Sequence, residues 1–173
     1  MGVRTQEAEA APRVRASVSG PGAAAVLFVF LVALLLLAAN GRPIGEPDKT
    51  GLAGWLFGGV LALVGHVFEL DVTGRAIVGK LLAAAFAAAA GAALFAAASA
   101  RHGTGEGRWA GFALALGTTL TAAAQSFSGE APATCAVAIA LWLLVQADAG
   151  DDGRIAAAAG LPLALAVAFQ PST

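Results

Sequence analysis

Apolar positions occur along this chain in long uninterrupted blocks, without the alternation of a strand or the stripe of a surface helix. The first block, Ala23–Ala39, contains no charged side chain. Its 17 residues lie at the short end of the length that crosses a bilayer as a helix. A secretory signal peptide is the alternative, because Leu37-Ala38-Ala39 can precede a cleavage site. We favour an uncleaved span, since the block exceeds the usual apolar region of a signal peptide and more apolar blocks follow.

Four later blocks are also predicted to be helices, with short polar turns between them. They cover Ala76–Ala100, Trp109–Ala124, Ala131–Ala147 and Ile155–Phe169. The free energy of transfer of alanine into lipid is close to zero, so Leu, Phe and Val supply the favourable transfer free energy. Each block is therefore a marginal span. Small side chains let helix backbones approach closely, so these helices are expected to pack on one another. The run Ala83–Ala93 is the expected packing face; low-complexity filler is the alternative.

The block Gly51–Phe68 allows two interpretations. It is long enough to span, with His66 as its only polar side chain, but its glycines make it a poor helix. If it spans, and the N-terminus is inside, the 10 Lys and Arg divide equally between the two sides. If it only lies at or dips into the outer face, six are inside and four outside. The positive-inside rule therefore favours an interfacial or re-entrant segment.

Composition agrees with a membrane protein. Hydrophobic residues make up 58% of the chain and charged residues only 12%, against about 25% charged in soluble domains. So few charges exclude a typical soluble enzyme, and a net charge of −1 gives no reason to expect a nucleic-acid partner. We predict an all-α fold: a polytopic transmembrane helical bundle of about five or six apolar segments. Residues 1–22 form a flexible cytoplasmic tail and residues 23–173 the transmembrane domain of a multi-pass protein of the cell membrane.

The first outer loop, residues 40–50, carries the residues best suited to catalysis or ligand binding. Asp48 and Glu46 supply two carboxylates, and Arg42 and Lys49 supply two cations. Carboxylate oxygens suit Mg²⁺ or Mn²⁺, which can bridge to a lipid phosphate. One of the acids could instead serve as a general base. The alternative is an ordinary solvated loop.

Three further polar positions each have two interpretations. Lys80 lies inside an apolar block and is either a functional intramembrane charge or a side chain that snorkels to the interface. The turn Gln125, Ser126, Ser128 and Glu130 either binds a sugar or phosphate or provides a helix cap at Ser128 or Gly129. Gly103–Gly107 lacks the lysine of a phosphate-binding loop and is predicted to be a turn.

Four ordered stretches resemble the N-terminal part of the GT-C superfamily of polytopic membrane glycosyltransferases, which includes the dolichyl-phosphate-mannose–protein mannosyltransferases. The resemblance covers about residues 23–173. The stretches are Asn40-Gly41-Arg42-Pro43-Ile44-Gly45 with Asp48-Lys49-Thr50; Gly51–Gly65; Gly79-Lys80-Leu81-Leu82; and Ala113–Thr119, followed by Gln125-Ser126 and Glu130-Ala131-Pro132-Ala133.

This resemblance implies a polyprenyl- or dolichyl-phosphate-linked sugar as donor and an inverting transfer at the non-cytoplasmic face. Asp48 is the position that matches the family's outer-loop acid, with Glu46 second, as base or as ligand of metal and phosphate. The first outer loop is shorter than in the family, and Gln170-Pro171-Ser172 stands where a basic residue often precedes proline. The spans number about half the usual set. We therefore expect a truncated or degenerate form without turnover on its own; the alternative is a small non-enzymatic membrane protein that acts as an assembly partner or scaffold.

Overall fold

The computed structural model describes residues 21–38, 51–117, 120–123 and 129–169, and every regular element within them is an α-helix. The predicted all-α class is therefore confirmed. The helices are α1 (Pro21–Ala38), α2 (Gly51–Val67), α3 (Val72–His102), α4 (Thr104–Gly117), α5 (Leu120–Ala123), α6 (Glu130–Gly150), α7 (Gly153–Ala158) and α8 (Gly160–Phe169).

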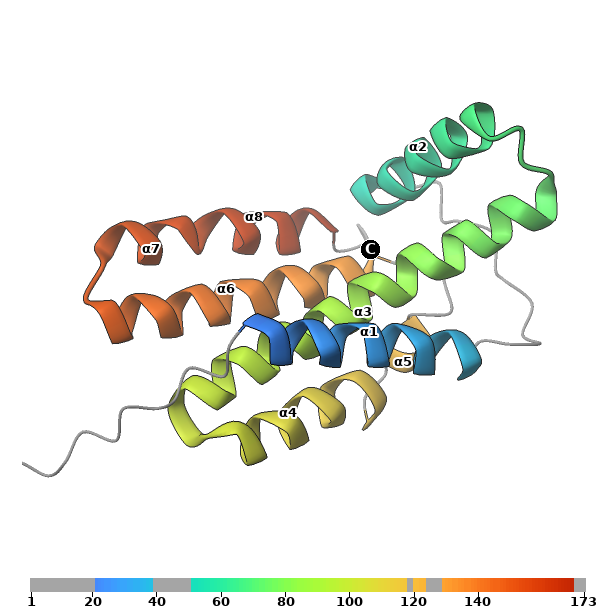
Figure 1. Cartoon of the computed structure of the whole chain (residues 1–173). Helices are drawn as coiled ribbons and strands as arrows, with labels where there is room; N and C mark the ends of the chain where they lie inside the picture. Colours follow the sequence, from blue (N-terminus) through green and yellow to red (C-terminus); the bar gives the residue numbers. More distant parts are fainter. Residues whose placement is uncertain (1–20, 39–50, 118–119, 124–128, 170–173) are drawn as a thin grey trace, which may run out of the picture.

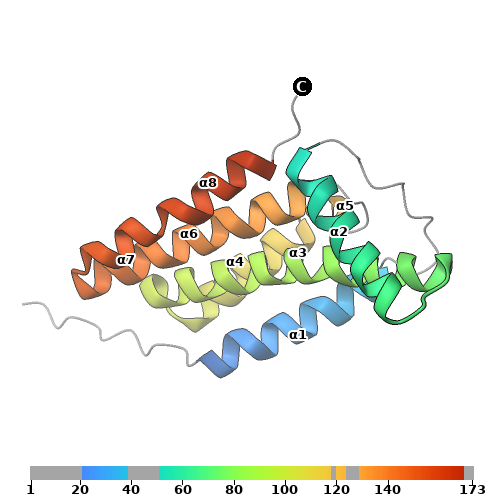
Figure 2. The same cartoon turned by 90° about the horizontal axis from the view of Figure 1, so that it is seen from above.

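Helix α3 is the centre of the bundle (Figure 1). It packs against α1, α4 and α6, and α6 in turn packs against α7 and α8. Seen from above, α8, α6 and α3 lie side by side, and α1 lies on the far side of α3 from α6 (Figure 2). Helix α2 contacts α3 and the end of α8, so the chain builds one bundle around a single long helix.

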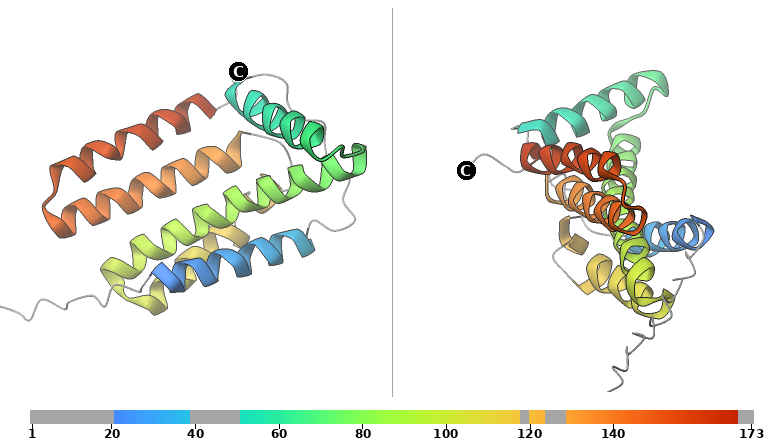
Figure 3. Two further views of the ribbon diagram at one scale, coloured as in Figure 1. Left: turned by 45° about the horizontal axis from the view of Figure 1, so that its top comes forward. Right: turned by 90° about the vertical axis from the view of Figure 1, so that its left-hand side faces the viewer.

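The helix ends gather at two ends of the bundle. The start of α1, the α3–α4 connection and the α6–α7 connection lie together at the left of Figure 1; we call this the α3–α4 end. An ion pair between α3 and α6, Arg101 to Asp148, lies there. The 31 residues of α3 extend about 46 Å, so α3 projects past the other end of the bundle and carries α2 on this projection (Figure 3).

Short polar side chains and one glycine set the helix boundaries. Asp71 caps α3, because its Oδ1 accepts a hydrogen bond of 2.7 Å from the backbone N–H of Gly74. Gly103 ends α3 with a φ of 104°, a conformation that favours glycine. Helix α4 begins at the next residue, so the predicted turn over Gly103–Gly107 is wrong beyond Gly103: one glycine suffices to reverse the chain.

Three other predictions of helix extent need correction. Gly51–Phe68 was expected to be a poor helix, yet α2 is continuous over Gly51–Val67, and glycine's cost did not prevent it. The block predicted at Trp109–Ala124 is displaced, since α4 begins at Thr104 and ends at Gly117. The block at Ile155–Phe169 is divided into α7 and α8.

Small side chains form most of the core. Ala84, Ala87 and Ala88 are essentially inaccessible, and Gly91 is buried beside them. The prediction that Ala83–Ala93 is a packing face, rather than filler, is therefore confirmed. The larger members of this core come mainly from α1: Leu27, Leu31 and Leu35, with Phe95 of α3.

Large apolar side chains point outward instead. Trp55 is 75% exposed, Leu161 70% and Val26 71%. Within the described residues two helices, α3 and α6, are long and apolar enough to cross a membrane by length and composition, and 44% and 28% of their most apolar stretches are buried. Shorter apolar helices cover Gly22–Leu37, Gly54–Val67 and Gly153–Phe169.

Candidate functional site

The residues predicted to carry chemistry in the outer loop lie outside the described part of the chain. These are Arg42, Glu46, Asp48 and Lys49. Gln125, Ser126 and Ser128 also lie outside it, whereas Gly129 is the N-cap of α6 and Glu130 its first residue. Gly129 thus occupies the N-cap position, with no side-chain cap hydrogen bond, and the choice between capping and binding stays a prediction. Among the described residues, no three His, Cys, Asp or Glu side chains come together as a possible metal site.

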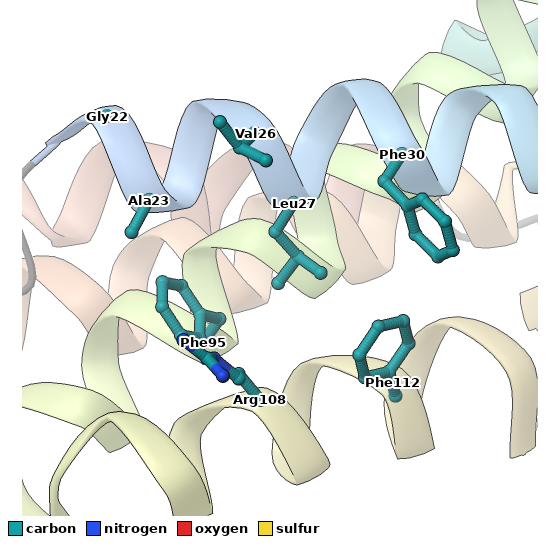
Figure 4. Close-up of a pocket in the computed structure, with 8 residues that line it drawn as sticks. All are labelled: Gly22, Ala23, Val26, Leu27, Phe30, Phe95, Arg108 and Phe112. Carbon is teal, nitrogen blue, oxygen red and sulfur yellow. The ribbon is translucent and has the colours of Figure 1, made fainter.

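One pocket among the described residues lies at the α3–α4 end, between the first turns of α1 and the adjoining parts of α3 and α4. It has a volume of about 510 Å³, and Figure 4 shows its walls. We call it the α1–α3–α4 pocket. It is lined by Gly22, Ala23, Val26, Leu27, Phe30, Phe95, Arg108 and Phe112.

Three aromatic rings and two small residues give this pocket its shape. Phe30 of α1 and Phe112 of α4 meet edge to face, with ring centroids 5.9 Å apart, and bring the two helices into contact. Gly22 and Ala23 occupy little space at the start of α1, which leaves the pocket open there (Figure 4). The result is an apolar hollow closed by rings on one side.

Helices α3 and α4 approach closely beside this pocket because glycines lie between them. A Cβ on Gly111 would lie 2.9 Å from the carbonyl oxygen of Gly91, and one on Gly107 would lie 1.9 Å from Ser99 Oγ. Ser99 is fully buried, and its hydroxyl is without a hydrogen-bond partner in the described part of the chain. Arg108 thus lies between two glycines at which α4 closely approaches α3.

Arg108 is the one ionisable residue among those that line the pocket. Within the described residues it makes no ion pair, whereas Arg101 is paired with Asp148 at 2.6 Å. The nearest acid in sequence, Glu106, directs its carboxylate toward Gly103: Oε2 lies 3.4 Å from where a Gly103 Cβ would be. The arrangement offers an unneutralised guanidinium at the edge of an apolar pocket, which suits an anion attached to an apolar chain.

Sequence reasoning missed both Arg108 and the glycine contact that places it. The available signal was the spacing Gly107, Gly111, Ala115, which puts small residues on one helix face. Lys80, which sequence reasoning did single out, is half-buried in the third turn of α3. No known protein family, curated protein or solved structure matches this chain.

Proposed function

We propose that the chain is a polytopic integral membrane protein, in which α1, α3, α4 with α5, α6, and α7 with α8 cross the bilayer. The distribution of side-chain size carries this proposal: alanine is the commonest residue of the core, while many leucine, valine, phenylalanine and tryptophan side chains are exposed. Soluble proteins rarely expose apolar patches on this scale. Lipid, by contrast, solvates large apolar side chains, and small residues between helices allow close packing there.

The grouping of helix ends supports an N-terminus in the cytoplasm. The start of α1 shares the α3–α4 end with both polar connections (Figure 1). Six of the 10 Lys and Arg then belong to the inner side, and four to the outer side, as the positive-inside rule requires. The inner set is Arg4, Arg13, Arg15, Arg101, Arg108 and Arg154, and the outer set is Arg42, Lys49, Arg75 and Lys80.

The position of α2 supports an interfacial or re-entrant segment at the outer face. It packs against the N-terminal part of α3 through Phe57 and Ala83. Counted back from His102 at 1.5 Å per residue, about 30 Å of hydrocarbon ends near Ala83, so this contact lies at the outer boundary of the crossing length. Trp55 is exposed on α2 and is a residue type enriched at membrane interfaces.

Accessibility of single cysteines tests this topology. Cys135 is replaced by alanine, and one cysteine is introduced at Arg42, Gly105 or Gly153. A Cβ at Gly105 or Gly153 meets nothing within 4 Å, so neither change disturbs packing. A membrane-impermeant maleimide should label position 42 in intact cells, and positions 105 and 153 only after permeabilisation. Labelling of 105 without 42 would reverse the orientation; labelling of both would make α2 a span.

For the biochemical role, we propose the one that the GT-C resemblance implies: binding of a polyprenyl-phosphate lipid by the loop between α1 and α2. Asp48 and Glu46 would hold Mg²⁺ or Mn²⁺ against the phosphate, and Arg42 and Lys49 would contact phosphate oxygens. The loop joins the end of α1 to the start of α2, on the outer side in the proposed topology. The resemblance implies that the polyprenyl-phosphate-linked sugar donor binds on this side.

Binding of polyprenyl phosphate to wild type and to Asp48→Asn, each with and without divalent cation, tests this role. We expect binding that depends on both Asp48 and the cation, and that Arg42→Gln also weakens. Equal binding in the four samples would remove the lipid-phosphate site. It would leave the alternative, a non-enzymatic membrane protein that acts as an assembly partner or scaffold.

A further inference from the structure

We propose that the α1–α3–α4 pocket and the groove beside it bind one anionic phospholipid of the inner leaflet, with the headgroup phosphate on Arg108 and an acyl chain along α1. This inference rests on the proposed membrane embedding, and concerns the opposite end of the bundle from the predicted outer loop.

Two hollows adjoin along α1, and together they give a path for one chain. The α1–α3–α4 pocket shares Val26 and Phe30 with a second groove of about 560 Å³, which is lined by Ala25, Val26, Val29, Phe30 and Ala33. From Gly22 to Ala33 the path follows α1 for about 16 Å at 1.5 Å per residue. That length is about half of the roughly 30 Å hydrocarbon core, which is the depth of one leaflet.

The charge on this path lies at one end only. Arg108 lies at the α3–α4 end, and the other residues along both hollows are apolar (Figure 4). An arginine can lay its methylenes along apolar surface while the guanidinium reaches the headgroup region. There it can bind two phosphate oxygens at once.

The charged groups nearby favour an anionic lipid over a zwitterionic one. Asp148 pairs with Arg101, and Glu106 directs its carboxylate toward Gly103, so neither forms an ion pair with Arg108. A choline headgroup brings its own cation next to the phosphate, whereas phosphatidylglycerol brings none. We therefore expect a preference for phosphatidylglycerol over phosphatidylcholine.

The test uses the full chain with Trp55→Phe and Trp142→Phe, which leaves Trp109 as its only tryptophan. Trp109 follows Arg108 and is 78% exposed. The protein is reconstituted into phosphatidylcholine vesicles that contain increasing fractions of brominated phosphatidylglycerol or brominated phosphatidylcholine. Quenching of Trp109 then gives the relative binding constant of the two lipids.

Wild type should prefer phosphatidylglycerol about fivefold, the effect of about one basic residue at an anionic surface. Arg108→Gln should lower this preference to about one, at an equal protein-to-lipid ratio. Arg154→Gln removes the same charge from the same end but does not line the pocket, so it should keep the preference. Ala23→Phe, which places a ring in the pocket, should reduce the preference although Arg108 is present.

Several results would overturn the site. Equal losses in Arg108→Gln and Arg154→Gln would mean a general surface charge, and complete competition by soluble glycerol phosphate would mean an anion site without a lipid chain. If the preference for phosphatidylglycerol appears only after residues 1–20 are removed, that segment and not a lipid occupies the pocket in the full chain. Failure of the membrane embedding is distinguishable, because brominated phosphatidylcholine would then leave Trp109 unquenched.

Discussion

The α3–α4 pair and the α2–α3 pair are built from similar sequences but held together differently. Both α2 and α4 carry two glycines four residues apart, Gly54 and Gly58 in α2, Gly107 and Gly111 in α4. In α4 both glycines lie against α3, where a Cβ would collide with backbone oxygen or with Ser99. In α2 a Cβ on Gly58 would meet nothing within 4 Å.

Side chains attach α2 to α3 instead: a ring packs near the middle of α2, and at its end Gly65 lies against the Arg75 side chain, where a Cβ would lie 2.7 Å from Nε. Phe57 is fully buried against Ala83, and its ring meets that of Phe86 edge to face at 6.1 Å. Close backbone approach gives many weak van der Waals contacts along the length of a helix. Attachment through side chains gives such contacts at only a few positions. We therefore expect α4 to be rigidly held and α2 to be the more easily detached helix.

The largest expected effect is that of Gly107→Ala. Its Cβ would lie 1.9 Å from Ser99 Oγ and 2.8 Å from the carbonyl oxygen of Phe95, and backbone cannot move as a side chain can. We expect a loss of about 3 kcal/mol in the free energy of unfolding, as for severe overpacking. Reversible SDS unfolding in mixed micelles, followed by circular dichroism, measures it. Adding Ser99→Gly to this variant should recover only part of the lost stability, because the carbonyl oxygen of Phe95 still obstructs the new methyl group. Wild-type stability of Gly107→Ala would refute the close approach.

Phe57→Ala should come next and act on α2 alone. Removal of the ring forfeits its edge-to-face contact and its packing on Ala83 and leaves a cavity, together about 3 kcal/mol. Hydrogen exchange should accelerate across Gly51–Val67 and stay unchanged in α4. Leu63→Ala is the matched control, since Leu63 lies on the same helix but is 65% exposed. Equal acceleration in both helices would mean that α2 and α4 open as one unit.

Gly58→Ala should stabilise α2, in contrast to the same change in α4. The new methyl group meets no neighbour, and alanine is better than glycine in a helix interior by about 0.8–1 kcal/mol. Slower hydrogen exchange around residue 58 would show the gain. A loss of stability would indicate a partner on this face of α2.

The smallest effect is expected from the ion pair that joins α3 to α6. The side chains of Arg101 and Asp148 are 54% and 70% exposed, so their coupling should be about 0.5 kcal/mol or less. A double-mutant cycle with Arg101→Ala and Asp148→Ala measures it at low and high salt. Coupling above about 1 kcal/mol that resists salt would mean a drier environment than the exposures indicate.

Sequence reasoning predicted much of the fold because long apolar blocks have few physical solutions. In a bilayer such a block must satisfy its backbone hydrogen bonds internally, so it forms a helix. The all-α class and the centres of α1, α3 and α6 followed from this, as did the packing role of Ala83–Ala93. The predicted site at Asp48 and Arg42 lies outside the described residues and stays a prediction.

The sequence by itself determined the all-α class, the centres of α1, α3 and α6, and which residues are small enough to lie between helices. Only the tertiary structure decided which small residues are used: the same glycine spacing occurs in α2 and in α4, but Gly107 and Gly111 lie against α3 whereas a Cβ on Gly58 would meet nothing within 4 Å. It alone brought Arg108 of α4 to a hollow that begins at Gly22 of α1. The physical reason is that helix formation depends on local hydrogen bonds, whereas a contact between helices depends on where residues far apart in sequence come to rest.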